Sequence, residues 1–262
     1  LSEPQLKRLM DLIHRYLPVE EAKEFTVEAG RPDSITKEKL RILRAAEVTR
    51  ISINPQTMKQ ETLDRIGRKH TVKQIKDVFY EARKQGFDNI NMDLIVGLPG
   101  EDEVDFVNTL LQIGKMEPDS VTVHSLAIKR AARLSLFKDK YEEMGLENNM
   151  QIMDMTARYC AEMELSPYYL YRQKNMAGNF ENVGYAKVDK AGIYNILIME
   201  EKQTILAAGA GASTKVVLPS DQPEVMESRI ERCENVKAVS QYIERIDEMI
   251  ERKEQFFCKN GI

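Results

Sequence analysis

The first 125 residues alternate four times between a short apolar segment and a longer amphipathic one, and this alternation limits the possible folds more than any other feature. The apolar segments predict β-strands at residues 24–28, 50–54, 89–96 and 120–124. Each connection is long enough for a helix that crosses back over the sheet, which is what parallel strands require. The pattern therefore predicts a parallel sheet with right-handed βαβ connections.

The amphipathic segments predict helices at residues 2–17, 36–46, 61–66, 72–85 and 102–115. In the first of them, Leu6, Leu9 and Ile13 recur at helical spacing, directly after a candidate capping box formed by Ser2 and Gln5. These helices are expected to cover the predicted sheet.

A polar side chain closes each of the four predicted strands. Glu28 ends the first strand, Gln56 follows the second, Asp93 interrupts the third near its end, and His124 ends the fourth. The carboxyl ends of parallel strands lie on one rim, where α/β proteins bind ligands. Together these residues predict a binding site. Each alone is equally compatible with a structural role, such as a turn cap for Asp93 or a hydrogen-bonded core histidine for His124.

Composition and charge exclude several classes of function. The 38 basic and 42 acidic residues give a formal charge of −4, so nothing suggests bulk attraction to nucleic acid or to an acidic membrane. No apolar segment approaches the ~20 residues that span a bilayer, and no signal peptide is recognisable. Cys160, Cys233 and Cys258 lie far apart without a CxxC-type partner, which predicts neither a disulfide framework nor a metal site. We therefore expect a cytoplasmic protein.

The regular alternation stops after residue 134, so we expect two domains, residues 1–134 and 135–262. The second part predicts helices at 134–144 and 148–163, a tyrosine-rich strand at 167–175, a turn-rich loop at 179–185, strands at 193–199 and 204–208, and a helical tail at 224–257. The buried stripe of the tail is expected to consist of Val236, Val239, Tyr242, Ile243, Ile246 and Ile250.

Two segments of this second part are compatible with ligand binding, and each also has a purely structural interpretation. The tyrosines of residues 168–171, next to Arg172, fit a strand that faces a planar or anionic ligand, and they fit simple aromatic packing equally well. The glycine-rich segment 209–215 lacks the spacing of a Walker loop. It predicts a tight turn or a close approach of the backbone to a ligand.

Read together, several ordered motifs identify a family. They are Val27-Glu28, Arg50-Ile51-Ser52-Ile53-Asn54-Pro55-Gln56, Ile66-Gly67-Arg68, Asn91-Met92-Asp93-Leu94-Ile95-Val96-Gly97-Leu98-Pro99, Tyr168 to Asn175, Asn179-Phe180 and Gly184-Tyr185. The series resembles the radical S-adenosylmethionine enzymes related to oxygen-independent coproporphyrinogen III oxidase, most closely the HemZ-type coproporphyrinogen dehydrogenase branch. The resemblance implies a (βα) barrel of the TIM type, here partial. Residues 1–134 are expected to form the barrel without its first strands, and residues 135–262 the remainder of the barrel and a C-terminal α/β extension.

The resemblance also implies roles for individual residues. Contacts to S-adenosylmethionine are expected from Glu28, Gln56, Arg68, Asp93 and Ala127, with the loop of Gly209, Gly211 and Ala212 closing over the cofactor. The substrate is expected to meet Tyr169, Tyr171, Arg172, Gly184 and Tyr185, with Arg172 a candidate for a propionate group. Carboxylates can accept hydrogen bonds from ribose hydroxyls or an ammonium group, and an arginine can pair with a carboxylate through two parallel hydrogen bonds. No catalytic residue is assigned.

The chain departs from the family pattern in one respect. Family members carry a CxxxCxxC loop whose thiolates hold a [4Fe–4S] cluster, and no such spacing occurs here. The sequence therefore resembles a family member without its first two strands. We expect a [4Fe–4S] cluster in the full-length protein, no cluster ligands in this chain, and little or no turnover by the chain alone.

For the full-length protein the resemblance implies oxidative decarboxylation of coproporphyrinogen III to protoporphyrinogen IX, with a reduced electron donor as a further partner. Two alternatives remain open at this point. Relatives in the family carry haem, so a haem chaperone is the first. The second is a cluster-free α/β module that uses Glu28, Arg68 and Asp93 to bind another small polar ligand.

Overall fold

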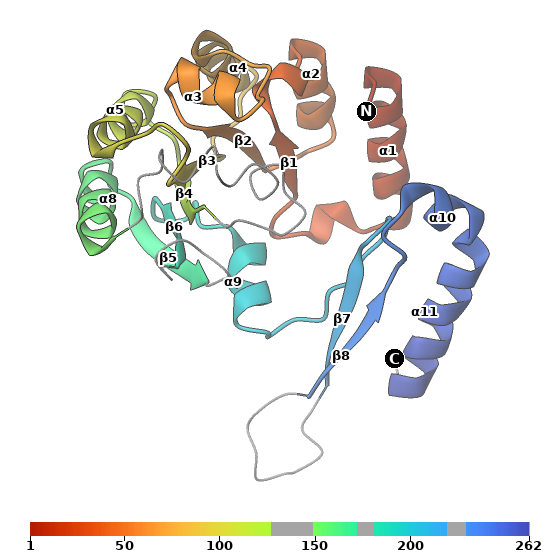
Figure 1. The fold of residues 1–262 in the computed structure, drawn as a ribbon. Helices are drawn as coiled ribbons and strands as arrows, with labels where there is room; N and C mark the ends of the chain where they lie inside the picture. Colours follow the sequence, from red (N-terminus) through yellow and green to blue (C-terminus); the bar gives the residue numbers. More distant parts are fainter. Residues whose placement is uncertain (127–148, 172–180, 219–228, 262) are drawn as a thin grey trace. The chain divides into compact units, whose positions relative to one another are not determined.

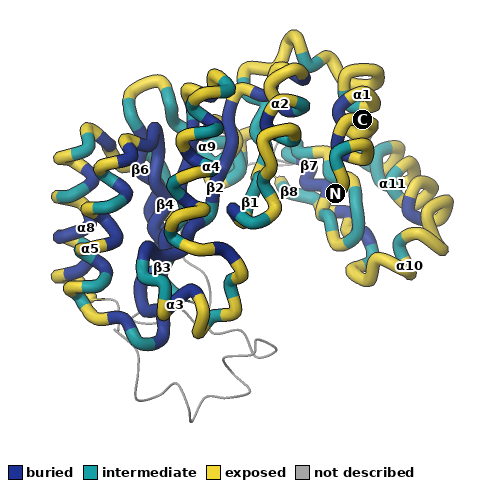
Figure 2. Tube along the Cα trace, turned by 90° about the horizontal axis from the view of Figure 1, so that it is seen from above, coloured by how far each residue is buried: buried dark blue, intermediate teal, exposed yellow. Residues whose placement is uncertain are grey.

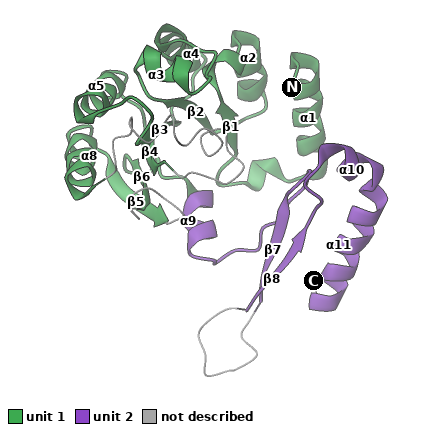
Figure 3. Ribbon diagram, viewed as in Figure 1, with its two compact units in different colours: residues 1–193 green, residues 194–262 purple. Residues whose placement is uncertain are grey.

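The computed structural model describes residues 1–126, 149–171, 181–218 and 229–261 (Figure 1). The chain forms two compact units, residues 1–193 and 194–262, coloured green and purple in Figure 3. The two units divide at residue 193, and strands from both sides of residue 134 join one sheet.

The first unit contains a six-stranded sheet with the order β1-β2-β3-β4-β6-β5. Its strands are β1 (Thr26–Gly30), β2 (Arg50–Gln56), β3 (Ile90–Val96), β4 (Ser120–Ser125), β5 (Ser166–Tyr171) and β6 (Asn182–Ala186). The first four strands are parallel, as the sequence predicts, and β6 lies antiparallel between β4 and β5. This sheet with its covering helices is a partial TIM-type barrel.

Helices of the first unit lie along the sheet (Figure 1). They are α1 (Glu3–Tyr16), α2 (Lys37–Ala45), α3 (Gln60–Arg65), α4 (Val72–Lys84), α5 (Glu103–Gly114) and α8 (Met150–Glu162), with short 3₁₀ turns at Val19–Glu21 (η1) and Pro32–Ser34 (η2). The capping box of Ser2 and Gln5 is present, so this sequence prediction is confirmed. The predicted helix at 134–144 lies outside the described residues.

Because side chains alternate along a strand, each strand of the sheet has a helix side and an opposite side. On the helix side, Ile53, Met92 and Leu94 are fully buried and pack with helix residues such as Phe79 and Phe106. Figure 2 shows this arrangement as dark blue strands behind helices whose outer faces are exposed. The hydrophobic core therefore lies between sheet and helices, and the opposite side of each strand is left for other residues.

The prediction of a loop at 179–185 is wrong for its second half, because Asn182–Ala186 forms β6. Asn182, Gly184 and their neighbours look turn-forming in isolation, but all five residues of this strand are buried between β4 and β5. Tertiary packing has overridden local preference here.

The second unit consists of α9 (Ile193–Met199), the antiparallel pair β7 (Ser213–Leu218) and β8 (Arg229–Glu234), and the helices α10 (Val239–Glu244) and α11 (Ile246–Asn260). α9 begins at the last residue of the first unit.

Several predictions for this region are wrong. Residues 193–199 form a helix although isoleucines make the segment resemble a strand, and residues 204–208 contribute only an isolated bridge between Ile205 and Lys215. The predicted helical tail contains a strand, β8. Within it, Val239, Ile243 and Ile250 are exposed, whereas Met249 is buried.

Candidate functional site

Two rows of side chains cross the sheet on the side that faces away from the helices. The first row is formed by Glu28, Ser52, Asn91 and Ser120, which are aligned across β1, β2, β3 and β4. The second row is formed by Asp93, Thr122, Gly184 and Tyr169, which are aligned across β3, β4, β6 and β5. We call these two rows the polar face. It brings together four residues that the sequence analysis assigned to a site: Glu28, Asp93, Tyr169 and Gly184.

Asn91 is the centre of the hydrogen-bond network on the polar face. Its amide nitrogen donates to Ser52 Oγ at 3.1 Å and to Asp93 Oδ1 at 2.7 Å. Its amide oxygen accepts from Ser120 Oγ at 3.0 Å and from Thr122 Oγ1 at 3.2 Å. Asn91 is buried and uses its donor and acceptor groups on both sides, so it fixes the orientation of the Asp93 carboxylate. The sequence analysis did not assign Asn91, although its spacing of two from Asp93 places both on one strand face.

The two carboxylates of the polar face, Glu28 and Asp93, repel each other. Removal from water raises the pKa of Glu28 above its usual value, and the charge of Asp93 raises this pKa further. Hydrogen bonds from Ser52 and Asn54 oppose the shift. His124 approaches the other side of Asp93, with 3.9 Å between Nε2 and Oδ2. A ligand that offers hydrogen-bond donors or a positive charge to both carboxylates would relieve this repulsion.

Arg50 supplies a buried positive charge at the start of β2. Only 2% of its surface is exposed, its guanidinium donates to Ser120 Oγ at 3.2 Å, and its Nε atom is buried without a hydrogen-bond partner. The positive charge lowers the pKa of Glu28 and so partly offsets the effect of Asp93. Sequence reasoning missed this residue, because an arginine at the start of a strand gives no indication that it will be buried.

Tyr169 lies directly over Gly184 on the polar face. A Cβ atom added to Gly184 would come within 2.0 Å of Tyr169 Cε1, so the ring occupies the space of the missing side chain. The rings of Tyr169 and Tyr171 stack almost in parallel, with centroids 6.3 Å apart and planes inclined by 9°. Burial raises the pKa of the Tyr169 hydroxyl, which is hydrogen-bonded to Thr122 and remains protonated at neutral pH. These stacked rings form an aromatic wall beside Asp93.

Tyr185, which the sequence analysis placed with the substrate, is on the other side of the same strand. It is 4% exposed and belongs to the hydrophobic core, and burial raises the pKa of its hydroxyl to about 12. Side chains alternate along β6, so Gly184 and Tyr185 point to opposite faces of the sheet. The structure therefore does not bring Tyr185 together with Tyr169.

Gln56 and Arg68 lie at the carboxyl end of the strands. Gln56 ends β2 with a left-handed backbone (φ 71°), and the register between β2 and β3 shifts between Ile53 and Gln56. A residue other than glycine in this region stores backbone strain, a feature found at ligand sites. Arg68 follows α3 and is half-buried. Removal from water lowers the pKa of its guanidinium below the usual value, so Arg68 is a cation with incomplete solvation.

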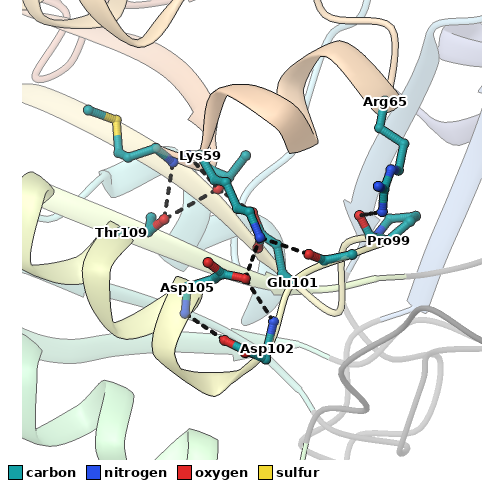
Figure 4. Close-up of polar contacts among 10 residues, drawn as sticks. Lys59, Arg65, Pro99, Glu101, Asp102, Asp105 and Thr109 are labelled. Carbon is teal, nitrogen blue, oxygen red and sulfur yellow. Dashed lines mark hydrogen bonds and ion pairs between the residues drawn. The ribbon is translucent and has the colours of Figure 1, made fainter.

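The loop that leaves β3 at residues 97–101 is anchored to two helices (Figure 4). Glu101 is 5% exposed and accepts a short hydrogen bond from Thr57 Oγ1, which lies 3.3 Å from Thr109 Oγ1. Burial raises the pKa of Glu101 above its usual value. Through these contacts the loop is tied to the segment before α3 and to α5.

A second set of contacts fixes the same loop from its exposed side. Lys59 Nζ donates to the Gly100 carbonyl at 2.9 Å and to Asp105 Oδ2 at 2.6 Å, and Arg65 donates to the Pro99 carbonyl at 3.2 Å (Figure 4). A loop held in this way keeps the end of β3, and with it Asp93, in a fixed position.

Five other assigned residues belong to other parts of the chain. Ala127 and Arg172 lie outside the described residues. The loop of Gly209, Gly211 and Ala212 belongs to the second unit, where Asn235 Nδ2 donates to the Gly209 carbonyl at 2.8 Å and Gly209 N donates to Tyr242 Oη at 3.2 Å. Its role over the cofactor stays a prediction.

The cysteines of this chain do not suit an iron–sulfur cluster. Cys160 and Cys233 are buried and Cys258 is exposed, on α8, β8 and α11 respectively. Burial raises the pKa of the Cys160 thiol to about 12, whereas cluster ligands are thiolates. In the part of the chain that the structure describes, no three His, Cys, Asp or Glu side chains gather into a metal site. No described helix has the length and apolar character to cross a membrane.

Comparison with known proteins gives a consistent set of relatives. Residues 2–113 match the family model of the radical SAM superfamily. The chain is 44% identical over 253 residues to the oxygen-independent coproporphyrinogen-III oxidase-like protein HemZ of Bacillus subtilis, covering 95% of this chain and 49% of that protein. It is 41% identical over 130 residues to the heme chaperone HemW of the same organism, covering 49% of this chain and 34% of that protein.

Among solved structures, coproporphyrinogen III oxidase (HemN) from Escherichia coli superimposes with a TM-score of 0.68 at 20% identity, covering 95% of this chain and 54% of that one. This likeness concerns the fold. The chain spans about half the length, or less, of these relatives.

Proposed function

Because the chain belongs to the radical S-adenosylmethionine superfamily, we propose that its polar face binds S-adenosylmethionine. The observation that carries the proposal is the alignment of Glu28 and Asp93 across β1 to β3, with both carboxylates connected through Ser52 and Asn91. The family uses S-adenosylmethionine together with a [4Fe–4S] cluster.

The residues present fit the cofactor. Glu28 and Asp93 offer carboxylate oxygens for ribose hydroxyls or for the ammonium group, and a positive group between them would offset the effect of Asp93 on the pKa of Glu28. Gln56 offers a donor and an acceptor at the end of β2. Arg68 offers a planar guanidinium for two parallel hydrogen bonds to the carboxylate of the methionine part.

The residues present do not fit the cluster, and no step through it is derived for this chain. When cofactor and cluster are both bound in a family member, they supply one-electron chemistry that removes a hydrogen atom from the substrate. The contribution of this chain is to hold the cofactor, to orient it and to exclude water from it.

For the protein as a whole, we propose oxidative decarboxylation of a propionate group of coproporphyrinogen III to a vinyl group, with an electron donor as partner. The similarity to the coproporphyrinogen-III oxidase-like protein HemZ supports this reaction. The aromatic wall of Tyr169 and Tyr171 offers aromatic contacts to a tetrapyrrole beside the cofactor site. Arg172 is a candidate contact for a propionate. We also propose that the protein works in the cytoplasm.

Calorimetric titration with S-adenosylmethionine tests cofactor binding. Asp93→Asn and Arg68→Ala should each weaken binding by about 1.5–3 kcal/mol, because each removes a charge-assisted contact. Arg41→Ala is the matched control, since Arg41 pairs with Glu38 on α2 at 3.4 Å, and it should leave the affinity unchanged. Unchanged affinity in both site variants would refute the site. Binding of another small polar ligand in place of S-adenosylmethionine would favour a cluster-free binding module.

A second candidate function is haem carriage, which the similarity to the heme chaperone HemW favours. A haem carrier would keep the barrel and the cofactor site and would not turn over porphyrinogen. Titration with haem, combined with an assay of coproporphyrinogen decarboxylation under reducing conditions, separates the two functions. Tight haem binding without decarboxylation would exclude the oxidase and support the carrier.

A further inference from the structure

A charged cluster lies directly after β1, where η2 turns the chain towards α2. Asp33 in η2 is its centre, with Arg31 Nη2 at 3.2 Å from Asp33 Oδ2 and His70 Nδ1 at 3.6 Å from Asp33 Oδ1. Asp33 Oδ1 is buried without a hydrogen-bond partner. A single carboxylate thus connects the end of β1 with the segment between α3 and α4.

Arg68 brings a second guanidinium to this cluster, two residues before His70. Removal from water lowers the pKa of Arg68, the charge of Arg31 lowers it further, and Asp33 opposes both effects. Arg68 forms no ion pair with the described part of the chain within the 4.0 Å limit for such contacts. Arg31 is paired with Asp33, whereas Arg68 feels the charge of Asp33 without an ion pair to it.

His70 adds no charge to this balance. Its side chain is completely buried, and burial lowers its pKa more than the nearby Pro55 carbonyl and Asp33 raise it. At neutral pH the ring is uncharged. The cluster of Arg31, Asp33 and Arg68 consequently carries one net positive charge at the carboxyl ends of β1 and β2, with Gln56 next to Pro55. One anionic group of a ligand would balance it.

We propose that Arg31 is a second cofactor-binding arginine, which contacts the carboxylate of S-adenosylmethionine together with Arg68. This inference rests on the proposed function. Asp33 pairs with Nη2 of Arg31, and the Arg31 side chain is 48% exposed, so its other donors remain accessible to a ligand. Planar guanidinium groups can pair on more than one edge, because they carry five donors.

The test compares two ligands by calorimetry: S-adenosylmethionine and its decarboxylated analogue, S-adenosyl-3-methylthiopropylamine. Arg31→Ala should weaken binding of S-adenosylmethionine roughly tenfold, as expected for loss of one charge-assisted hydrogen bond. The same variant should bind the decarboxylated analogue as the unaltered protein does. Arg68→Ala should show the same selectivity, and Arg41→Ala should affect neither ligand.

A double variant separates direct contact from a purely structural role. Arg31→Ala leaves Asp33 unpaired, which alone could weaken binding of an anionic group. Arg31→Ala combined with Asp33→Asn restores the net charge of the cluster. Binding should stay weak in the double variant when Arg31 contacts the ligand.

Three results overturn the inference. Full recovery of affinity in the double variant, or equal weakening for both ligands, would assign Arg31 a structural role while leaving the proposed function intact. Failure of the unaltered protein to bind S-adenosylmethionine would remove the proposed function and this inference together.

Discussion

The two faces of the six-stranded sheet are made from the same strands and differ in almost every physical property. On β3, Met92 and Leu94 point to the helices and are fully buried in apolar surroundings, whereas Asn91 and Asp93 point to the polar face. The helix side derives its free energy from burial of apolar surface. The polar face consists of hydrogen bonds around buried groups and of carboxylates that repel each other. Along one strand, alternate residues therefore contribute to the stability of the core and to the proposed binding site.

The largest loss of stability is expected from a substitution on the helix side of the sheet. Leu94→Ala should lower the free energy of unfolding by about 2–5 kcal/mol, because it opens a cavity in a fully packed core. Denaturation by urea measures this loss, with Val104→Ala as the control, since Val104 is 65% exposed on α5. The affinity of the folded fraction for S-adenosylmethionine should stay unchanged. A selective loss of affinity would contradict the separation of the two faces.

A smaller effect is expected from the hydrogen-bond centre of the polar face. Asn91→Leu should destabilise the protein by roughly 2–3 kcal/mol, because the hydroxyls of Ser120 and Thr122 lose their acceptor inside the protein. It should also weaken cofactor binding, since Asp93 loses the amide that orients it. Measuring unfolding and calorimetric affinity on the same variant checks both. Loss of stability without loss of affinity would show that Asp93 is held by other contacts.

The next effect concerns the aromatic wall. Gly184→Ala should cost roughly 1–2 kcal/mol, because the new methyl group overlaps the Tyr169 ring and displaces it. Gly114→Ala is the matched control, since its nearest neighbour is the flexible Met163 side chain at 3.4 Å.

The ring overlap can be tested separately by removing the ring. In a protein with Tyr169→Ser, the additional change Gly184→Ala should have almost no cost. A cost that persists without the ring would show that Gly184 is required for its backbone and not for the space above it.

The same comparison shows which parts of the fold the sequence could predict. Strands β1 to β4 and their helices follow from local hydrophobic periodicity, and Glu28 and Asp93 follow from being acidic residues in apolar segments. The sequence analysis expected them near strand ends, whereas both lie in the middle of their strands, β1 and β3. β6 could not be predicted in this way, because its strand conformation depends on pairing between β4 and β5 and on the Tyr169 ring over Gly184. α9 was mistaken for a strand because isoleucine and tyrosine favour strands in isolation.

The residues of the candidate site could be predicted only where the pattern of polar and apolar residues within a single strand indicates them. Asn91 and Arg50 act through partners on other strands, at separations of 29 and 70 residues for their contacts with Ser120. Asp33 pairs with Arg31, its near neighbour in the sequence, and also approaches His70, which lies beyond α3. A network of this kind depends on the register of the strands, and no local pattern of the sequence specifies register across the sheet.

The smallest effect on stability is expected at Glu28, and its sign is opposite to that of the others. The pKa of Glu28 is raised in the folded protein above its ordinary value of 4.5, so the folded state binds a proton more tightly than the unfolded state. The free energy of unfolding therefore decreases as the pH rises from the pKa of Glu28 in the unfolded state to its pKa in the folded state. Above the folded-state pKa the Glu28 carboxylate is ionised and the decrease is complete.

Glu28→Gln removes this contribution and keeps the shape of the side chain. The variant should be slightly more stable than the unaltered protein at pH 7.5, and the difference should disappear below the ordinary pKa of 4.5. Urea denaturation at pH 4 and pH 7.5 measures the difference. The same substitution should weaken binding of S-adenosylmethionine, because one charged acceptor is lost. Greater stability with weaker binding would mean that the repulsion between Glu28 and Asp93 destabilises the fold while both carboxylates contribute to ligand binding. Unchanged stability at pH 7.5 would show that solvent already screens this repulsion.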